Sequence, residues 1–183
     1  AREAPNERPR IPAKARSIVP TDHDLTDVTH GMADLEPGLR LHYVSAGDGA
    51  RIIVLLHGFP QTWWEWRRVI PALVEGGSRV VAPDYRGSTG YGREYREAID
   101  YGGLEVDDVV AARDWAVGAL PAVDPLRVGI LGWSHGGLIA LMASFDHPDK
   151  FQAVYAGVPV SDLVARMGYQ TDDYRALFSA PYH

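Results

Sequence analysis

The chain of 183 residues contains no cysteine, which excludes disulfide bonds, a thiol nucleophile and zinc sites with cysteine ligands. No apolar run approaches the roughly 20 residues that a membrane-spanning helix needs, so we expect no membrane partner. The net charge is -6 and no stretch is rich in lysine and arginine, which argues against nucleic acid as a partner. No sorting signal is visible, so the compartment, cytoplasmic or secreted, stays open.

Motifs that bind metals or nucleotides are also lacking. The sequence contains no H-E-x-x-H, no EF-hand loop and no P-loop. Gly90-Tyr91-Gly92 lacks the third glycine of a dinucleotide fingerprint and precedes no clear helix start. We therefore predict no cofactor and no metal.

Residues 1–20 differ in composition from the rest of the chain. They hold four of the 13 prolines together with many charges, and they show no apolar periodicity. These features predict an extended N-terminal arm over residues 1–20 and one globular domain over residues 21–183.

The domain begins with alternating patterns and continues with buried ones. Residues 27–35 and 39–46 alternate imperfectly between apolar and polar, as two half-buried strands joined by a turn would. Residues 52–56 form a continuous apolar run, as strands covered on both faces do in a parallel sheet, and three later segments look similar: 79–82, 127–131 and 151–158.

Helical patterns separate these strands. We predict a helix around 66–73 in which Pro71 starts a fresh helix, an amphipathic helix over 106–120, and a helix at 136–145 that is apolar nearly all round. Residues 87–103 are predicted as a long loop with a short helix. Strands and helices in alternation predict an α/β fold with a doubly wound, mostly parallel sheet.

Ser134 stands where chemistry is expected. Gly132-Trp133-Ser134-His135-Gly136 follows an apolar strand and opens an apolar helix, which is the context of the G-x-S-x-G nucleophile elbow. Small residues two before and two after the serine let the strand and the helix approach closely. The alternative is a glycine-rich turn that only permits packing.

Acyl transfer also needs two converging N–H donors for the oxyanion. We expect them from His135, which follows the nucleophile, and from Phe59 in the loop His57-Gly58-Phe59-Pro60. His57 is more typical of a residue that shapes this loop than of a base. Trp63 and Trp64 are candidates for an apolar substrate pocket, with ordinary core packing as the alternative.

From these motifs the chain resembles the α/β-hydrolase superfamily. Residues 39–87, with His57-Gly58-Phe59-Pro60 and Asp84-Tyr85-Arg86-Gly87, resemble epoxide hydrolases. Residues 85–183, with Gly132-Trp133-Ser134-His135-Gly136-Gly137 and Gly157-Val158-Pro159-Val160-Ser161-Asp162, resemble the catalytic domain of the prolyl oligopeptidase family. The change near residue 87 would fit a natural hybrid, a fusion or a designed chimera.

This resemblance implies an acid and then a histidine after the serine. Asp162 is a candidate acid, although an N-cap role is favoured, and His183 is a weak candidate base. His147 and His135 are expected to serve elsewhere. We expect the catalytic histidine and the last strands to lie beyond residue 183, so that the domain is incomplete at its C-terminus and a homodimer through an exposed sheet edge is expected.

Three functions remain open at this point. The first is a serine hydrolase that cleaves a small ester or peptide through Ser134. The second is an incomplete or inactive hydrolase-fold protein that binds without turnover. The third is epoxide hydrolysis, which a serine disfavours because attack on an epoxide would give an ether that water does not readily cleave.

Overall fold

The computed structural model describes residues 27–36 and 39–178. The predicted arm over residues 1–20 and the predicted turn at Pro37-Gly38 lie outside the described residues, as does His183.

The described chain folds around one six-stranded sheet with the strand order β1-β2-β4-β3-β5-β6. The antiparallel part comprises β1 (Thr29–Glu36) and β2 (Leu39–Ala46), and β2 is also antiparallel to β4 (Arg79–Pro83). The other pairings are parallel and join β4, β3 (Ile52–Leu56), β5 (Val128–Trp133) and β6 (Ala153–Gly157). The predicted mostly parallel sheet is confirmed.

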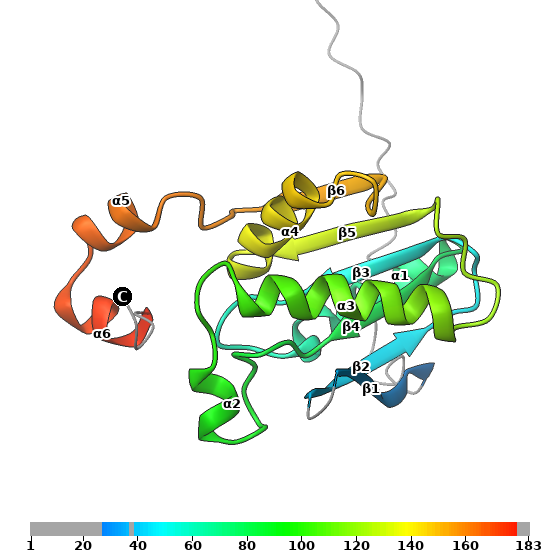
Figure 1. Cartoon of the computed structure of the whole chain (residues 1–183), viewed down its shortest axis with the longest axis horizontal. Coiled ribbons are helices and arrows are strands. Elements are labelled where there is room, and N and C mark those ends of the chain that lie inside the picture. The colour runs from blue at the N-terminus through cyan, green and yellow to red at the C-terminus, as the bar shows by residue number, and fades with distance from the viewer. Residues whose placement is uncertain (1–26, 37–38, 179–183) are drawn as a thin grey trace, which may run out of the picture.

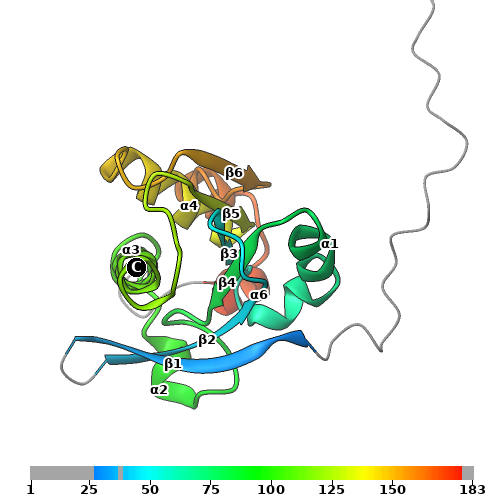
Figure 2. The ribbon, with the colours of Figure 1, turned by 90° about the vertical axis from the view of Figure 1, so that its right-hand side faces the viewer.

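Helices cover both faces of this sheet. The long helices α3 (Leu104–Ala119) and α4 (His135–Asp146) lie on one face, and η2 (Trp63–Arg68) and α1 (Ile70–Glu75) lie on the other (Figure 1 and Figure 2). The short helix α2 (Arg93–Glu97) interrupts the predicted loop. Two more short helices, α5 (Leu163–Gly168) and α6 (Asp172–Phe178), lie beyond the carboxyl ends of the parallel strands (Figure 1).

The predicted start of a fresh helix at Pro71 is confirmed, because α1 begins at Ile70 with the proline in its first turn, where the missing N–H costs nothing. The segment before it, η2, is a 3-10 helix. The prediction of a buried helix at 136–145 needs one correction, because Phe145 near the end of α4 is 75% exposed.

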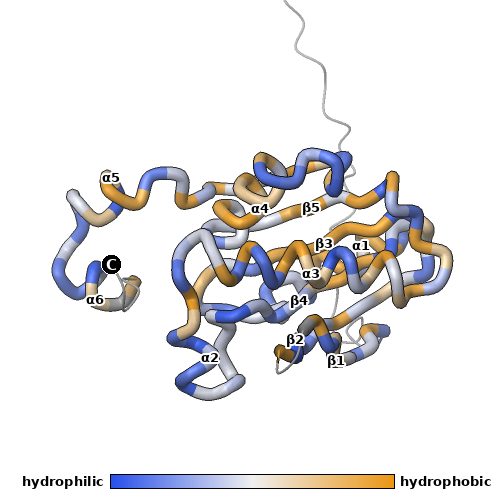
Figure 3. The backbone as a smooth tube through the Cα atoms, in the orientation of Figure 1, coloured by the Kyte–Doolittle hydropathy of each residue, from blue (hydrophilic) through white to orange (hydrophobic). Residues whose placement is uncertain are grey.

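The main core lies between the sheet and the face that α3 and α4 cover. Apolar side chains from three neighbouring strands and both helices are fully buried there, namely Ile52, Val54, Leu56, Val81, Val109, Ile130, Ile139 and Ala140. The strands β3 and β5 stand out as apolar ribbons in Figure 3. Burial of this surface, at about 25 cal/mol per Å², is the main force that fixes the strands. Because β3 and β5 pair in parallel, with Leu56 opposite Gly132, the loops that follow them emerge side by side.

Candidate active site

Ser134 occupies the sharp turn between β5 and α4. Its backbone has φ 55° and ψ -113°, a conformation that is strained for a residue with a side chain. Three backbone hydrogen bonds hold it there. The N–H of Ser134 donates to the carbonyl of Gly157 at 2.9 Å, and its carbonyl accepts from the N–H groups of Leu138 at 3.1 Å and Val160 at 3.4 Å. The turn has the strained geometry expected of a nucleophile elbow.

The two glycines that flank the elbow are required by close backbone contacts. A Cβ at Gly132 would overlap the carbonyl of Gly136. A Cβ at Gly136 would overlap the carbonyl oxygens of Leu56 and His57. The spacing of small residues in the motif is therefore set by the crossing of α4 over β3 and β5.

The loop after β3 lies directly against the elbow. A Cβ placed on Gly58 would be 3.5 Å from the Cβ of Ser134. Helix α4 begins at His135, so the N–H of His135 is among those that have no partner within the helix. The rings of Phe59 and His135 are 6.2 Å apart. The structure thus brings both predicted oxyanion residues to Ser134, and their role as donors stays a prediction.

His57 is buried beneath this loop and is not directed to Ser134. Its Nδ1 lies 2.8 Å from the carbonyl oxygen of Gly58 and its Nε2 lies 2.8 Å from the hydroxyl of Ser88. Its ring stacks on Tyr85 at 4.4 Å. Burial lowers the pKa of His57 to about 4, against smaller opposing effects of Gly58 and Asp84. A neutral imidazole with both nitrogens engaged shapes the loop, as the sequence indicated.

His135 binds a buried carboxylate that the sequence analysis missed. Its Nε2 lies 2.9 Å from Oε1 of Glu105, and the two side chains are 2% and 0% exposed. Burial acts to raise the pKa of Glu105, but the hydrogen bonds from His135 and Asp100 outweigh it and lower the pKa to about 2. Glu105 stands in the first turn of α3, where an acid is ordinarily explained by the helix dipole, so no pattern in the chain signals this contact.

No described histidine bonds the hydroxyl of Ser134. His147 caps the far end of α4, about 18 Å along the helix axis from the elbow at 1.5 Å per residue. His30 and His42 belong to the first two strands, where Nδ1 of His30 lies 2.9 Å from Nε2 of His42 and Nδ1 of His42 lies 2.8 Å from the carboxylate of Asp84. The candidate base His183 lies outside the described residues.

Ser134 lines a hollow of about 400 Å³ together with the segment that follows β6. Asp162 lies in this hollow and is also the N-cap of α5, where its carboxylate accepts the N–H of Ala165 at 2.7 Å. The N-cap role that the sequence favoured is therefore present. A role for Asp162 as the acid stays a prediction.

Trp63 and Trp64 are absent from the residues that line this hollow. Trp63 lies edge-on to His30 at 5.3 Å and donates its backbone N–H to Asp84 at 2.6 Å. Trp64 is 47% exposed and stacks with Arg67. Their predicted role in substrate binding has no support from this placement, and Trp63 follows the packing alternative.

Asp84 and Arg86 both bind structural partners at the carboxyl end of the sheet. Asp84 is fully buried and accepts hydrogen bonds from His42, Trp63 and Tyr91. The guanidinium of Arg86 forms a bidentate pair with Asp108 of α3. The carboxylates of Asp84 and Asp108 thus hold loops in place at the carboxyl end of the sheet.

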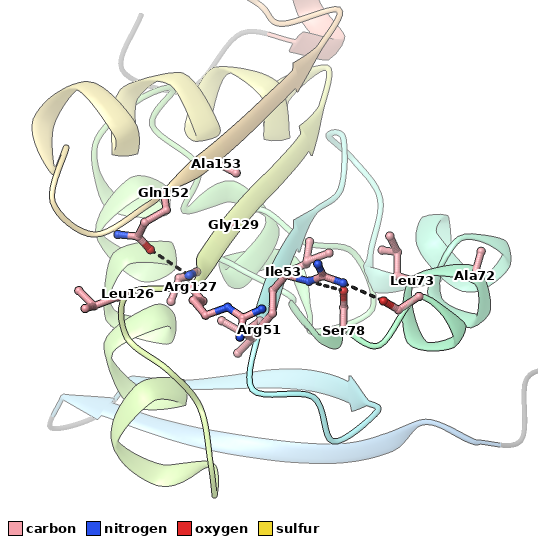
Figure 4. Close-up of a pocket in the computed structure, with 13 residues that line it drawn as sticks. Arg51, Ile53, Ala72, Leu73, Ser78, Leu126, Arg127, Gly129, Gln152 and Ala153 are labelled. Atoms are coloured by element: carbon pink, nitrogen blue, oxygen red, sulfur yellow. Dashed lines mark hydrogen bonds between the residues drawn. The ribbon is translucent and has the colours of Figure 1, made fainter.

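A second hollow, of about 480 Å³, opens at the opposite end of the sheet (Figure 4). It lies beside the amino ends of β3 and β5, between Leu73 of α1 and Gln152. Its lining includes Arg51 and Arg127 but no carboxylate and no imidazole. Although larger, it lacks the groups that acyl transfer needs, and the hollow at Ser134 is the candidate active site.

In residues 27–36 and 39–178, no helix combines the length and apolarity needed to cross a bilayer. Within the same ranges, no three histidine or acidic side chains gather as ligands for a metal ion.

Comparison with known proteins places the chain among hydrolases of two kinds. The soluble epoxide hydrolase of Corynebacterium sp. is 34% identical over 142 residues, covering 71% of this chain and 41% of that protein. Epoxide hydrolase A of Mycobacterium tuberculosis is 39% identical over 143 residues, covering 77% and 42%. The chain thus spans less than half the length of these relatives.

Solved structures show the same two likenesses. A puromycin-hydrolyzing peptidase of Mycobacterium tuberculosis superposes with a TM-score of 0.72 at 25% identity, covering 87% of this chain and 26% of that one. An epoxide hydrolase from Vigna radiata gives a TM-score of 0.59 at 27% identity, covering 70% and 39%. The fold is therefore that of the α/β-hydrolases. The sequence pattern of the prolyl oligopeptidase family matches residues 64–180, more than half of the chain, which therefore belongs to the prolyl oligopeptidase family.

Proposed function

We propose that the chain is a serine hydrolase that transfers an acyl group from a small ester or peptide to water, with Ser134 as the nucleophile. The observation that supports this most directly is the strained backbone of Ser134, with φ 55°, against the loop that carries Phe59. A strained serine at a strand-to-helix turn is the arrangement that exposes a hydroxyl to a substrate carbonyl.

In the proposed reaction the hydroxyl oxygen of Ser134 attacks the carbonyl carbon while its proton passes to a base. The oxyanion that forms accepts hydrogen bonds from the N–H groups of Phe59 and His135, and the N-terminus of α4 favours its negative charge. Collapse of this intermediate expels the protonated alcohol or amine and leaves an ester on Ser134. Water then attacks this ester, which releases the acid and restores the serine.

The base is the incomplete part of the proposal. The described histidines are engaged elsewhere, and a serine without an oriented base is a weak nucleophile at neutral pH. We infer that His183 or a group from a partner subunit supplies the base, and that turnover without it is weak. Asp162, in the same hollow as Ser134, is the candidate to orient such a base.

A fluorophosphonate tests the nucleophile without a choice of substrate. We expect intact mass spectrometry to show one adduct on the purified chain and none on Ser134→Ala. Ser161→Ala, which alters a second serine of the same hollow, should keep the adduct. A folded protein that gains no adduct would contradict the proposal and favour a hydrolase-fold protein that binds without turnover.

Epoxide hydrolysis is the second candidate because the curated relatives carry that name, for instance at 34% identity over 142 residues. The serine opposes it, since alkylation of Ser134 would leave a stable ether. Incubation with styrene oxide should therefore give no diol, and any reaction at Ser134 should stop at a covalent adduct. Formation of the diol that disappears in Ser134→Ala would favour epoxide hydrolysis over acyl transfer.

A further inference from the structure

We propose that Arg166 binds a carboxylate of the substrate beside Ser134, so that the site selects esters and amides that carry an acidic group near the scissile bond. This inference rests on the proposed function of Ser134 and names its substrate class.

Arg166, in the hollow at Ser134, forms no ion pair with any described residue. Among the described residues that line it, Arg166 is the sole cation and Asp162 is the sole acid. The carboxylate of Asp162 accepts the N–H of Ala165 at the start of α5, and no ion pair joins it to Arg166. The charge of Arg166 is therefore available to a ligand in the hollow.

The guanidinium of Arg166 is held in one orientation. Its Nε donates to the hydroxyl of Tyr174 at 2.7 Å. Its planar group lies over the rings of Tyr174 and Phe178, at 5.2 and 4.8 Å from their centres. Neither terminal nitrogen has an acceptor among the described residues. A fixed guanidinium with two unengaged NH₂ groups suits bidentate binding of a carboxylate, with little ordering left for the binding step.

The guanidinium also lies near the oxyanion residues. It stacks on the ring of Phe178, and that ring is 6.3 Å from the ring of Phe59. The ring of Phe59 is in turn 6.2 Å from that of His135. One aromatic ring thus separates Arg166 from the loop that carries the proposed oxyanion donor Phe59.

Kinetics on a matched pair of esters test this assignment. Mono-4-nitrophenyl glutarate carries a carboxylate, and 4-nitrophenyl methyl glutarate has the same chain without the charge. We expect the protein to favour the acid by about tenfold in kcat/KM, as one charge-assisted contact allows. Arg166→Gln should bring the ratio to about one. Arg127→Gln removes an equal charge from the opposite end of the sheet and should keep the wild-type ratio.

Disruption of α5 and α6 would slow hydrolysis of both esters. The ratio of the two kcat/KM values therefore separates the loss of the Arg166 charge from a loss of folding. A wild-type ratio near one, or a high ratio that persists in Arg166→Gln, would overturn the proposal. A high wild-type ratio that falls in both Arg166→Gln and Arg127→Gln would assign the preference for the acid to long-range charge, and this would also overturn the proposal.

Binding to Ser134→Ala tests Arg166 without turnover. Calorimetry should show that monomethyl glutarate binds and that dimethyl glutarate binds about tenfold more weakly or not at all. In the double variant that adds Arg166→Gln to Ser134→Ala, the difference in affinity between monomethyl and dimethyl glutarate should disappear. Selective binding in a protein whose serine accepts no fluorophosphonate would leave the carboxylate site standing and contradict the hydrolase. Equal binding of the two esters would overturn the carboxylate site whatever the serine does.

Discussion

The imidazole of His135 lies 2.9 Å from the carboxylate of Glu105, and both side chains are buried directly behind the nucleophile elbow. Glu105 in turn accepts the backbone N–H of Gly102 at 2.8 Å. This contact ties the first residue of α4 to the first turn of α3. It therefore fixes the start of α4, and with it the N–H of His135, beside Ser134.

Loss of the Glu105 carboxylate should destabilise the fold. Glu105→Ala leaves His135 and the N–H of Gly102 buried without their acceptor, and we expect the free energy of unfolding to fall by about 3 kcal/mol. Glu105→Gln keeps an acceptor and should cost less. Urea denaturation measures both, with Glu97→Gln on the exposed helix α2 as the control. An equal, small effect of all three variants would contradict the assigned role.

The same carboxylate should contribute to acid sensitivity. Its pKa in the folded protein is about 2, below the ordinary 4.5, so the fold favours the charged form. The stabilisation is complete above pH 4.5 and is lost as the pH falls toward 2. Glu105→Gln should therefore lose less stability than wild type between pH 5 and pH 3. A parallel decline of the two proteins would show that Glu105 is not the group involved.

His57 should titrate near pH 4 because burial opposes its charge. A folded pKa below the ordinary 6.5 means that its contribution to stability is present above pH 6.5 and is lost as the pH falls through about 4. NMR spectra of the ring nitrogens, recorded over a pH series, measure the midpoint. A midpoint near 6.5 in the folded protein would show that the ring is solvated, contrary to its 1% exposure.

The glycines of the elbow should tolerate no side chain. Gly132→Ala places a Cβ against the carbonyl of Gly136, and we expect a loss of about 3 kcal/mol or more in the free energy of unfolding. Gly118→Ala, in α3 with open space around it, should instead stabilise by about 1 kcal/mol. Thermal and urea unfolding compare the pair. A tolerated Gly132→Ala would mean that α4 can move away from β5.

The outer edge of β6 should promote self-association. Among the described strands β6 pairs with β5 alone, and Val154 and Tyr155 are 42% and 55% exposed. The strand carries no charge, so two copies can pair without opposing like charges. We propose a homodimer through this edge. Sedimentation equilibrium should show a dimer that Tyr155→Lys weakens at least tenfold, about 1.4 kcal/mol, while Phe145→Lys at the end of α4 leaves it intact. Equal weakening by both would assign the contact to the helix.

Local patterns in the sequence were enough to predict the frame of the site. Apolar runs predicted the parallel strands because burial on both faces requires such runs. Gly132 and Gly136 around Ser134 predicted the elbow because the backbone contacts of the turn depend on nearest neighbours in the chain. The placement of His57 in a loop that it shapes followed from the same local reasoning.

Contacts between distant segments were decided by the tertiary structure alone. Glu105 meets His135, and Arg166 enters the hollow of Ser134, because the sheet order brings the ends of separate elements together. Such pairs lie 30 residues or more apart in the chain, as Glu105 and His135 do, and leave no periodic signal. The sequence by itself thus determined the sheet and the sharp turn at Ser134, whereas packing determined which charges surround the serine, since a buried charge is specified by its partner and not by its neighbours in the chain.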